Sequence, residues 1–187
     1  MKLSKPRLEP LQENQWNDEI RDMMKPIKDQ QGGVPNIFKT LAHHPKLMRR
    51  WLVFGNHVLF KSTLPARERE LVILRIGWLC QAEYEWAQHV RIGLQAGLTK
   101  DEIHRIKTGA SAPGWSERDQ LLLKATDELH KDAHISDATW QGLSKHYNVQ
   151  ELMDVVFAVG QYNLVSMALN TLGVQLEPGV STTFENT

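Results

Sequence analysis

Residues 67–103, RERELVILRIGWLCQAEYEWAQHVRIGLQAGLTKDEI, contain the pattern that decides the fold of this chain. Within them, the run 71–78 is apolar except for Arg75, its one charged residue. Because an α-helix turns about 100° per residue, a run that is apolar on nearly all sides predicts a buried helix. The residues that follow mix polar and apolar side chains with a helical period, which predicts a second, amphipathic helix. We therefore predict adjacent helices over about 66–80 and 82–96.

Turn and cap residues divide the rest of the chain into further helices. Thr99, followed three residues later by Glu102, has the pattern of a capping box, and Ser116 and Ser136 stand at expected helix starts. The further helices are predicted over about 11–29 (interrupted by Pro26), 37–43, 45–60, 100–108, 116–131, 136–147 and 150–172. No stretch alternates polar and apolar residues over a useful length, so no strand is predicted. The predicted fold class is all-α.

Length, charge and composition restrict the class of protein. The chain has 187 residues, of which 41% are hydrophobic, so a packed globular interior is expected. Lys plus Arg and Asp plus Glu number 22 each, which gives a formal net charge of zero. Nucleic acids and acidic membrane surfaces are bound through a positive field, so neither is an expected partner.

Three further features bear on the expected compartment. Cys80 is the only cysteine, so one chain can form neither an intramolecular disulfide nor a thiolate zinc cage. The first residues, MKLSKPRLEPLQEN, lack an apolar run after their lysines and do not resemble a secretory signal. Residues 155–176 are long and apolar enough to cross a bilayer, but polar side chains are scattered around that helix. We therefore expect a core or interface helix there, and a soluble cytoplasmic protein.

Three ionisable side chains are predicted on inward faces of the two helices in 67–103. His89 falls near the centre of the apolar side of its helix, and Glu85 lies about 40° away from it. Glu70 lies on the buried helix, away from Arg75. Because an unpaired inward polar group is costly, we expect the three to meet in a small cavity. Such a cluster suits proton transfer, since a carboxylate tunes a histidine, and burial allows a glutamate to keep its proton.

The residues alone leave other interpretations open. His89 also fits a satisfied core histidine, and Glu85 and His89, four residues apart, also fit a plain helix contact. A metal site would use Glu70 together with that pair, but it needs more nitrogen ligands than this region offers. His57 or His130 would have to be recruited from elsewhere, so no metal is predicted.

The segment 67–103 resembles the carboxymuconolactone decarboxylase family, which includes alkyl hydroperoxidase D and its relatives. The resemblance rests on Arg-Glu-Leu before an apolar helix, then YEW-x-x-H, then AGL-[ST]-x-x-EI, with weaker similarity at 32–45 and 150–172. It implies an all-α, alkyl hydroperoxidase D-like fold that assembles into trimers or hexamers, with the pocket near subunit contacts. It also implies one domain, 1–187, with a helical extension over about 1–60 and a core over about 61–176.

The chain departs from the peroxidase branch of that family at two positions. That branch has a glutamate, a Cys-x-x-Cys pair, and a histidine four residues after the second cysteine. Glu70 and His89 match the outer positions by spacing, but Ala82 and Glu85 occupy the two cysteine positions. Peroxide reduction by that route needs an attacking thiolate and a resolving thiol, so dithiol peroxidase activity is not expected. Cys80 lies two residues before the first position and is expected to be a small apolar filler.

The decarboxylase branch uses neither thiol nor cofactor. The resemblance therefore implies a cofactor-free carboxy-lyase or isomerase acting on a small lactone or oxo-acid, as in the catabolism of aromatic compounds. His89 would be the main acid/base, Glu70 its orienting partner and Glu85 a second proton carrier. The candidate substrate-binding side chains are Tyr84, Trp86, Tyr162 and Asn163. Two alternatives stay open, namely a thiol-dependent antioxidant protein that uses Cys80 and a non-catalytic oligomeric scaffold.

A substrate with two carboxylates calls for a cationic anchor. The helical wheel places Arg75 and Arg91 on outward faces of their helices. The sequence therefore predicts no arginine in the pocket of its own subunit, although either side chain could reach a neighbour's pocket in an oligomer.

Overall fold

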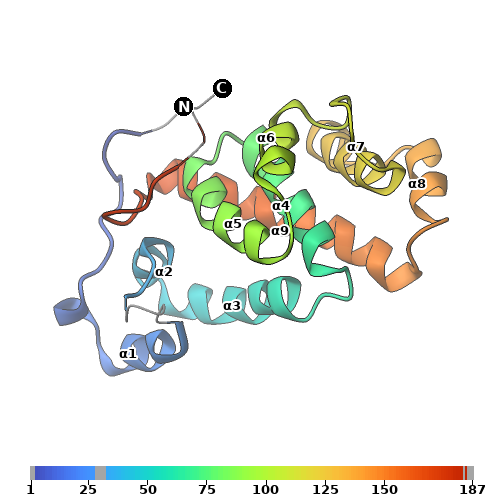
Figure 1. Cartoon of the computed structure of the whole chain (residues 1–187). Coiled ribbons are helices and arrows are strands. Elements are labelled where there is room, and N and C mark those ends of the chain that lie inside the picture. Colours follow the sequence, from blue (N-terminus) through green and yellow to red (C-terminus); the bar gives the residue numbers. More distant parts are fainter. Residues whose placement is uncertain (1–2, 28–32, 183, 185–187) are drawn as a thin grey trace.

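The structure is a computed structural model that describes residues 3–27, 33–182 and 184. Helices separated by short turns make up these residues, and no strand occurs among them, so the all-α prediction is confirmed (Figure 1). The elements are the 3-10 helices η1 (Glu13–Gln15) and η2 (Lys25–Ile27) and the α-helices α1 (Asp18–Met24), α2 (Asn36–Leu41), α3 (Pro45–Phe60), α4 (Ala66–Leu79), α5 (Glu83–Gln95), α6 (Lys100–Thr108), α7 (Glu117–Asp132), α8 (Asp137–Leu143) and α9 (Val149–Leu172).

Helix α4 is the centre of the core. It packs against α5, α6, α7 and α9, and residues 70–77 are all buried. The prediction of a helix buried on nearly every side is confirmed, because neighbours cover α4 around its circumference (Figure 1). This arrangement places any polar side chain of α4 inside the protein.

Arg75 is one such polar side chain of α4, and its predicted outward position is wrong. It is only 7% exposed, and its Nε donates to Asp127 Oδ1 of α7 at 2.6 Å. Its Nη1 donates to the carbonyl oxygens of Ile106 and Lys107 at 2.8 and 2.9 Å. The helical wheel gave the direction of Arg75 on α4 but not the presence of α6 and α7 on that side. Arg75 therefore joins three helices rather than facing solvent.

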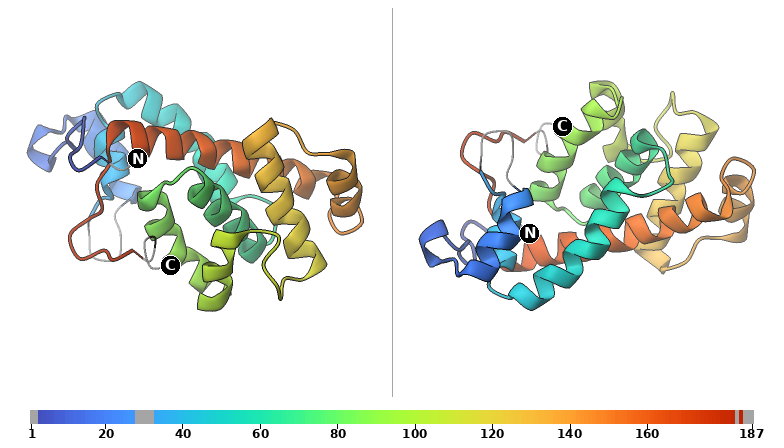
Figure 2. Two further views of the ribbon diagram at one scale, coloured as in Figure 1. Left: turned by 90° about the horizontal axis from the view of Figure 1, so that it is seen from above. Right: turned by 90° about the horizontal axis from the view of Figure 1, so that it is seen from below.

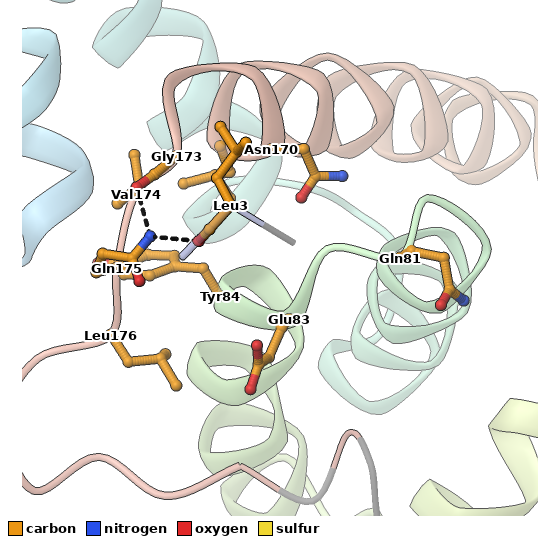
Figure 3. A pocket seen from close by; sticks show the side chains of 10 residues that line it. Leu3, Gln81, Glu83, Tyr84, Asn170, Gly173, Val174, Gln175 and Leu176 are labelled. Atoms are coloured by element: carbon orange, nitrogen blue, oxygen red, sulfur yellow. Dashed lines mark hydrogen bonds between the residues drawn. The ribbon is translucent and has the colours of Figure 1, made fainter. Parts of the chain in front are cut away.

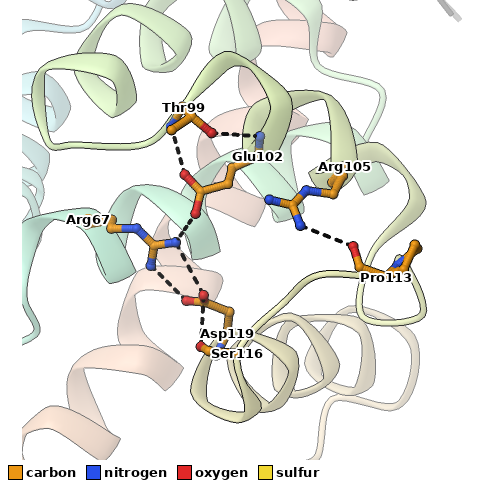
Figure 4. A network of polar contacts seen from close by, with 7 residues as sticks. All are labelled: Arg67, Thr99, Glu102, Arg105, Pro113, Ser116 and Asp119. Carbon is orange, nitrogen blue, oxygen red and sulfur yellow. Dashed lines mark hydrogen bonds and ion pairs between the residues drawn. The ribbon is translucent and has the colours of Figure 1, made fainter.

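A second polar network joins the starts of α4, α6 and α7 (Figure 4). Arg67 Nη1 donates to Asp119 Oδ1 at 2.8 Å, and Arg67 Nη2 also contacts Glu102. Glu102 closes the predicted capping box with Thr99, and Ser116 caps α7 by accepting from the Asp119 N–H. The two predicted caps are confirmed, and the network fixes three helix starts relative to one another.

The remaining boundaries differ modestly from those predicted. The first predicted helix is divided into η1, α1 and η2, and residues 28–29 lie outside the described part of the chain. Helix α8 ends at Leu143, four residues earlier than predicted. Helix α3 and helix α6 have the predicted bounds.

Helix α9 runs along the length of the molecule, with α3 beside it (Figure 2). Among the described residues it is the one helix long and apolar enough to cross a membrane, judged by length and composition alone, and half of its most apolar window is buried. It packs against α3, α4, α5 and α7. These contacts are those of a core helix, as predicted.

The N-terminal elements have a small hydrophobic cluster of their own. Buried side chains from α1, α2, α3 and the adjoining loops form it, namely Trp16, Ile20, Met24, Val34, Ala42 and Met48. The main core instead combines α4 to α9. The extension thus packs as a separate layer against the core, and this layer forms one wall of the cavity described next.

Candidate active site

The three ionisable residues predicted to meet do meet. Glu70 of α4 and the α5 residues Glu85 and His89 are 0%, 4% and 6% exposed. His89 Nδ1 lies 2.7 Å from Glu70 Oε2, and His89 Nε2 lies 3.0 Å from Glu85 Oε1. The imidazole is therefore held between two carboxylates, with both ring nitrogens in hydrogen-bond contact.

A helical hairpin positions this triad. Helices α4 and α5 are joined by residues 80–82, so the two inward faces are brought together. Gly93 of α5 faces α4, where an added Cβ would lie 3.2 Å from Leu74 Cδ1 and 3.8 Å from Glu70 Cβ. Any larger residue at Gly93 would push the two helices apart. The close approach allows Glu70 to reach His89 across the helix pair.

Electrostatics fix the protonation of His89. Burial alone would lower the pKa of His89, but the adjacent charges of Glu85 and Glu70 raise it to about 10. At neutral pH the ring is therefore an imidazolium that donates a proton to each carboxylate. Arg69 Nε, 3.3 Å from Glu70 Oε1, supplies a second positive charge on the buried side of the triad.

This shift predicts how stability depends on pH. The folded pKa of His89 is raised above its ordinary value of 6.5, so the stabilising contribution of His89 is complete below about pH 6.5 and is lost as pH rises to about 10. We expect the free energy of unfolding of the wild type to exceed that of His89→Gln most at pH 6, with the difference shrinking towards pH 10. Urea denaturation of both proteins across this range tests the expectation. A difference that grows with pH would contradict it.

A cavity of about 380 Å³ opens beside the triad, between the N-terminal layer and helices α5 and α9. Glu85 and His89 line it, whereas Glu70 lies behind them. The wall supplied by the N-terminal layer is mostly apolar and comprises Met23, Pro26, Ile27, Pro35, Ile37, Phe38, Trp51, Leu52, Leu59 and Phe60. The cavity therefore combines an apolar wall with an ionised pair.

The structure places only two of the four predicted substrate-binding residues at the cavity. Tyr84 and Tyr162 line it. Trp86 does not, because it is fully buried and packs its ring against Trp78 at a centroid distance of 5.6 Å. Asn163 also points elsewhere, and its Oδ1 accepts a hydrogen bond from Cys80 Sγ at 3.0 Å. The prediction for Trp86 and Asn163 is therefore corrected, since α5 and α9 turn those side chains towards other neighbours.

Four polar or charged cavity residues were not predicted as such, namely Asn56, Gln88, Arg91 and Gln161. Arg91 lines the cavity, so its placement away from the pocket is wrong. The wall reaches Arg91 because the N-terminal layer covers that side of α5, and helical periodicity alone gives no indication of this. Gln161 also lines the cavity and is 5% exposed. The only feature of the sequence that indicated a role for Gln161 was its position in the most apolar stretch.

A smaller pocket of about 200 Å³ lies on the other side of Tyr84 (Figure 3). The Gln175 amide closes it by donating to the carbonyl oxygens of Leu3 and Gly173 at 3.1 and 2.8 Å. The Tyr84 hydroxyl donates to Glu177 Oε1 at 2.6 Å, which anchors the segment after α9 to α5. Tyr84 therefore lines both this pocket and the larger cavity.

The comparisons with known proteins agree with this fold. The sequence profile of the carboxymuconolactone decarboxylase family matches residues 45–128, which include the whole triad. The crystal structure of an uncharacterized peroxidase-related protein with an alkylhydroperoxidase AhpD core, from Ralstonia eutropha JMP134, is similar with a TM-score of 0.82. That match has 21% sequence identity and covers 92% of this chain and 93% of that chain. Residues 45–128 thus match the carboxymuconolactone decarboxylase family, and the described chain has an AhpD-like fold.

Other members with the AhpD-like fold are similar over the same extent. An uncharacterized peroxidase-related protein from Silicibacter sp. TM1040 has a TM-score of 0.78 at 18% identity, covering 95% of this chain and 92% of that chain. A variant of the debrominase Bmp8 in complex with 2,3,4-tribromopyrrole has a TM-score of 0.72 at 14% identity, covering 94% of both chains. No curated protein matches the chain significantly in sequence.

Unlike the peroxidase branch that it resembles, this chain lacks the Cys-x-x-Cys pair. Ala82 is fully buried at the start of α5, and Glu85 faces the cavity at the second cysteine position. Cys80 is half-buried and does not line the cavity, and burial raises the pKa of its thiol. A raised pKa keeps Cys80 as a thiol rather than the thiolate that peroxide chemistry needs.

Proposed function

We propose that this protein is an acid/base enzyme of the carboxymuconolactone decarboxylase type, acting without a cofactor on a small lactone or oxo-acid. One observation carries the proposal, namely an imidazolium held between two carboxylates at the edge of a cavity. The position at which the peroxidase branch has its second thiol holds Glu85, which is one of those carboxylates. A group that exchanges protons thus replaces a group that exchanges electrons.

Each of the three residues has a distinct role in this proposal. Glu85 lies at the cavity surface and is the group that exchanges a proton with substrate carbon. His89, 3.0 Å behind it, receives or returns that proton through Nε2. Glu70 is fully buried and holds the imidazolium from the opposite side through Nδ1. Glu70 is thus a positioning residue, whereas Glu85 and His89 move protons.

A decarboxylation fits these roles. In a carboxylated, conjugated lactone the bond to the departing carboxylate breaks, and its electron pair moves through the ring onto the lactone carbonyl oxygen. Carbon dioxide leaves, and the Nε2 proton of His89 passes to Glu85, which delivers it to the ring carbon beside the carbonyl. The apolar wall favours loss of charge from the departing carboxylate. Removal and return of a proton by the same pair would give an isomerisation.

The alternative of a thiol-dependent antioxidant protein rests on Cys80. Its Sγ contacts Asn163, and its thiol lies outside the cavity, so it is not placed to meet a ligand bound there.

The complex of the debrominase with a small aromatic heterocycle shows that a protein of this fold accepts small ring compounds, which fits the cavity proposed here.

Two measurements separate these functions. Incubation with small lactones and oxo-acids in heavy water, followed by NMR, is expected to show deuterium entering the carbon beside the carbonyl, at equal rates in the wild type and Cys80→Ser. Peroxide consumption with an external dithiol is expected to stay at the uncatalysed rate. Rapid thiol-dependent peroxide turnover that disappears in Cys80→Ser would refute the acid/base function.

We also propose that the protein self-associates through the outer face of α9. Val149, Met153, Phe157, Leu164 and Met167 are each half or more exposed and follow one side of the helix. Phe157 contacts Phe54 of α3, which extends this apolar stripe. The stripe leaves several hundred Å² of apolar surface, on the order of the 800 Å² that each partner buries in a standard interface. Since these side chains carry no charge, a second copy of the chain can cover them without repulsion.

Substitution within the stripe tests this proposal. Phe157→Glu is expected to reduce the molar mass of the wild-type assembly to that of a monomer, because a charge would be buried at the interface. Leu94→Glu, at an exposed apolar residue of α5 outside the stripe, should leave the assembly intact. Light scattering coupled to size-exclusion chromatography measures both, and a monomeric wild type would contradict the proposal.

A further inference from the structure

Two buried polar groups in the cavity have no hydrogen-bond partner. Gln161 and Tyr162 are 5% and 6% exposed, and both line the cavity. Among the described residues, neither the Gln161 amide nor the Tyr162 hydroxyl forms a hydrogen bond. Their polar atoms are not among those sealed from solvent without a partner, so both groups are open to the cavity and available to a ligand.

The two groups lie beside the triad. The Tyr162 ring meets the His89 ring edge-to-face, with centroids 4.8 Å apart. The Gln161 amide passes close to α3 at Gly55, where an added Cβ would lie 3.3 Å from Gln161 Nε2. Burial, and then the negative charges of Glu85 and Glu70, raise the pKa of Tyr162 well above its ordinary value. Tyr162 therefore remains a hydroxyl donor, and the Gln161 amide is a second donor on the cavity wall.

A cation lines the same cavity. Arg91 is exposed at the cavity, and within the described residues its guanidinium makes no ion pair. It follows Glu85 by six residues on α5, so the two Cα atoms are about 9 Å apart along the helix axis. The cavity wall thus carries a donor pair, a proton carrier and a cation.

Most of the remaining cavity surface is apolar, with Asn56 and Gln88 as its other uncharged polar residues. Ile92 and Val165 line it from α5 and α9, opposite the aromatic and aliphatic residues of the N-terminal layer. A ligand that fills this space must bury hydrocarbon against Phe38, Trp51 and Phe60. A second carboxylate against this wall would be desolvated without a partner.

We propose that the substrate is an amphiphilic oxo-acid or lactone-acid with a single carboxylate that binds Arg91, a carbonyl oxygen that accepts from Gln161 and Tyr162, and an apolar body against the N-terminal layer. This inference rests on the proposed function and narrows it to the isomerisation, since the one carboxylate is held by Arg91 and is not lost, and small dicarboxylates do not suit the mostly apolar wall. Donation from both groups also stabilises the negative charge that develops on the carbonyl oxygen when Glu85 removes the adjacent proton.

A binding experiment tests this substrate class without requiring turnover. The probe is 6-oxo-6-phenylhexanoate, which carries one carboxylate and one ketone separated by a flexible methylene chain. Its primary amide removes the negative charge, and 2-oxoheptanedioate replaces the phenyl ring with a second carboxylate. Isothermal titration calorimetry with Glu85→Gln, which retains the shape of the site, measures all three Kd values.

The acid is expected to bind at least tenfold more tightly than either its amide or the dicarboxylate. Arg91→Gln should weaken the acid about tenfold and leave the amide unchanged, whereas Arg50→Gln, at an exposed arginine outside the cavity, should change neither. Gln161→Leu and Tyr162→Phe should each weaken acid and amide alike, by about fivefold to tenfold, because both ligands keep the ketone.

Equal binding of acid and amide, or an unchanged Kd in Gln161→Leu and Tyr162→Phe, would overturn the inference. Failure of the proposed function gives a different result. Tight, selective binding of the acid without hydrogen exchange in the wild type would refute the acid/base function alone. Hydrogen exchange on a substrate whose Kd is unchanged by substitution of Arg91, Gln161 and Tyr162 would refute this inference alone.

Discussion

Glu85→Gln is expected to lower the rate of proton exchange on substrate by about 10²- to 10⁴-fold, the usual contribution of a general acid/base group. The amide keeps the size of Glu85, and its oxygen still accepts from His89 Nε2, so the helix pair and the cavity are retained. It neither takes up nor releases a proton at neutral pH. The loss should therefore appear in kcat, with a KM that changes little, as measured by NMR exchange or carbon dioxide release.

A matched control lies two residues earlier on the same helix. Glu83 is also buried at the start of α5 but does not line the larger cavity. Glu83→Gln removes the same charge and is expected to retain most of the wild-type rate. If Glu85→Gln retained the rate as well, the scaffold without catalysis would become the better account of the molecule.

Glu70→Met is expected to destabilise the protein by about 3–5 kcal/mol, the typical cost of removing one partner from a buried ion pair. Glu70 is fully buried, and its carboxylate lies 2.7 Å from His89 Nδ1. Methionine matches the unbranched shape of the side chain but cannot accept that hydrogen bond, so a buried N–H loses its partner. Urea denaturation followed by circular dichroism gives the free energy of unfolding.

The triple variant Glu70→Met, Glu85→Met, His89→Leu serves as the control. Replacing a whole buried charged cluster by apolar residues of similar size is often neutral or stabilising by about 1–4 kcal/mol. We therefore expect the triple variant to unfold at a urea concentration near that of the wild type or above it, while having no exchange activity. A triple variant as unstable as the single one would mean that the triad serves the fold.

The two results together would distinguish function from stability. A cluster that is costly to break singly, yet dispensable to the fold as a whole, is retained for its chemistry. Because Glu85 faces the cavity and Glu70 does not, the first substitution tests proton transfer to substrate and the second tests how the imidazolium is held.

The sequence alone determined the helices and the triad. The apolar run 71–78 predicted the buried helix α4, and Thr99 and Ser116 predicted two helix starts that the structure confirms. The inward positions of Glu85 and His89 followed from helical periodicity, which is a local property of the chain. The spacing from Glu70 to His89 likewise carried the resemblance to the family.

Only the tertiary structure decided what surrounds the triad. Arg75 became buried because α6 and α7 cover its side of α4, and Arg91 came to line a cavity because the N-terminal layer covers its side of α5. The helical wheel likewise predicted that Trp86 points inward, but it could not distinguish a position in the core from one that lines the cavity. A residue's direction on its own helix is set by local geometry, but whether that direction meets solvent, core or a cavity is set by segments distant in sequence. The proton-transfer group was therefore predictable from residues 67–103, whereas the binding surface that selects its substrate was not.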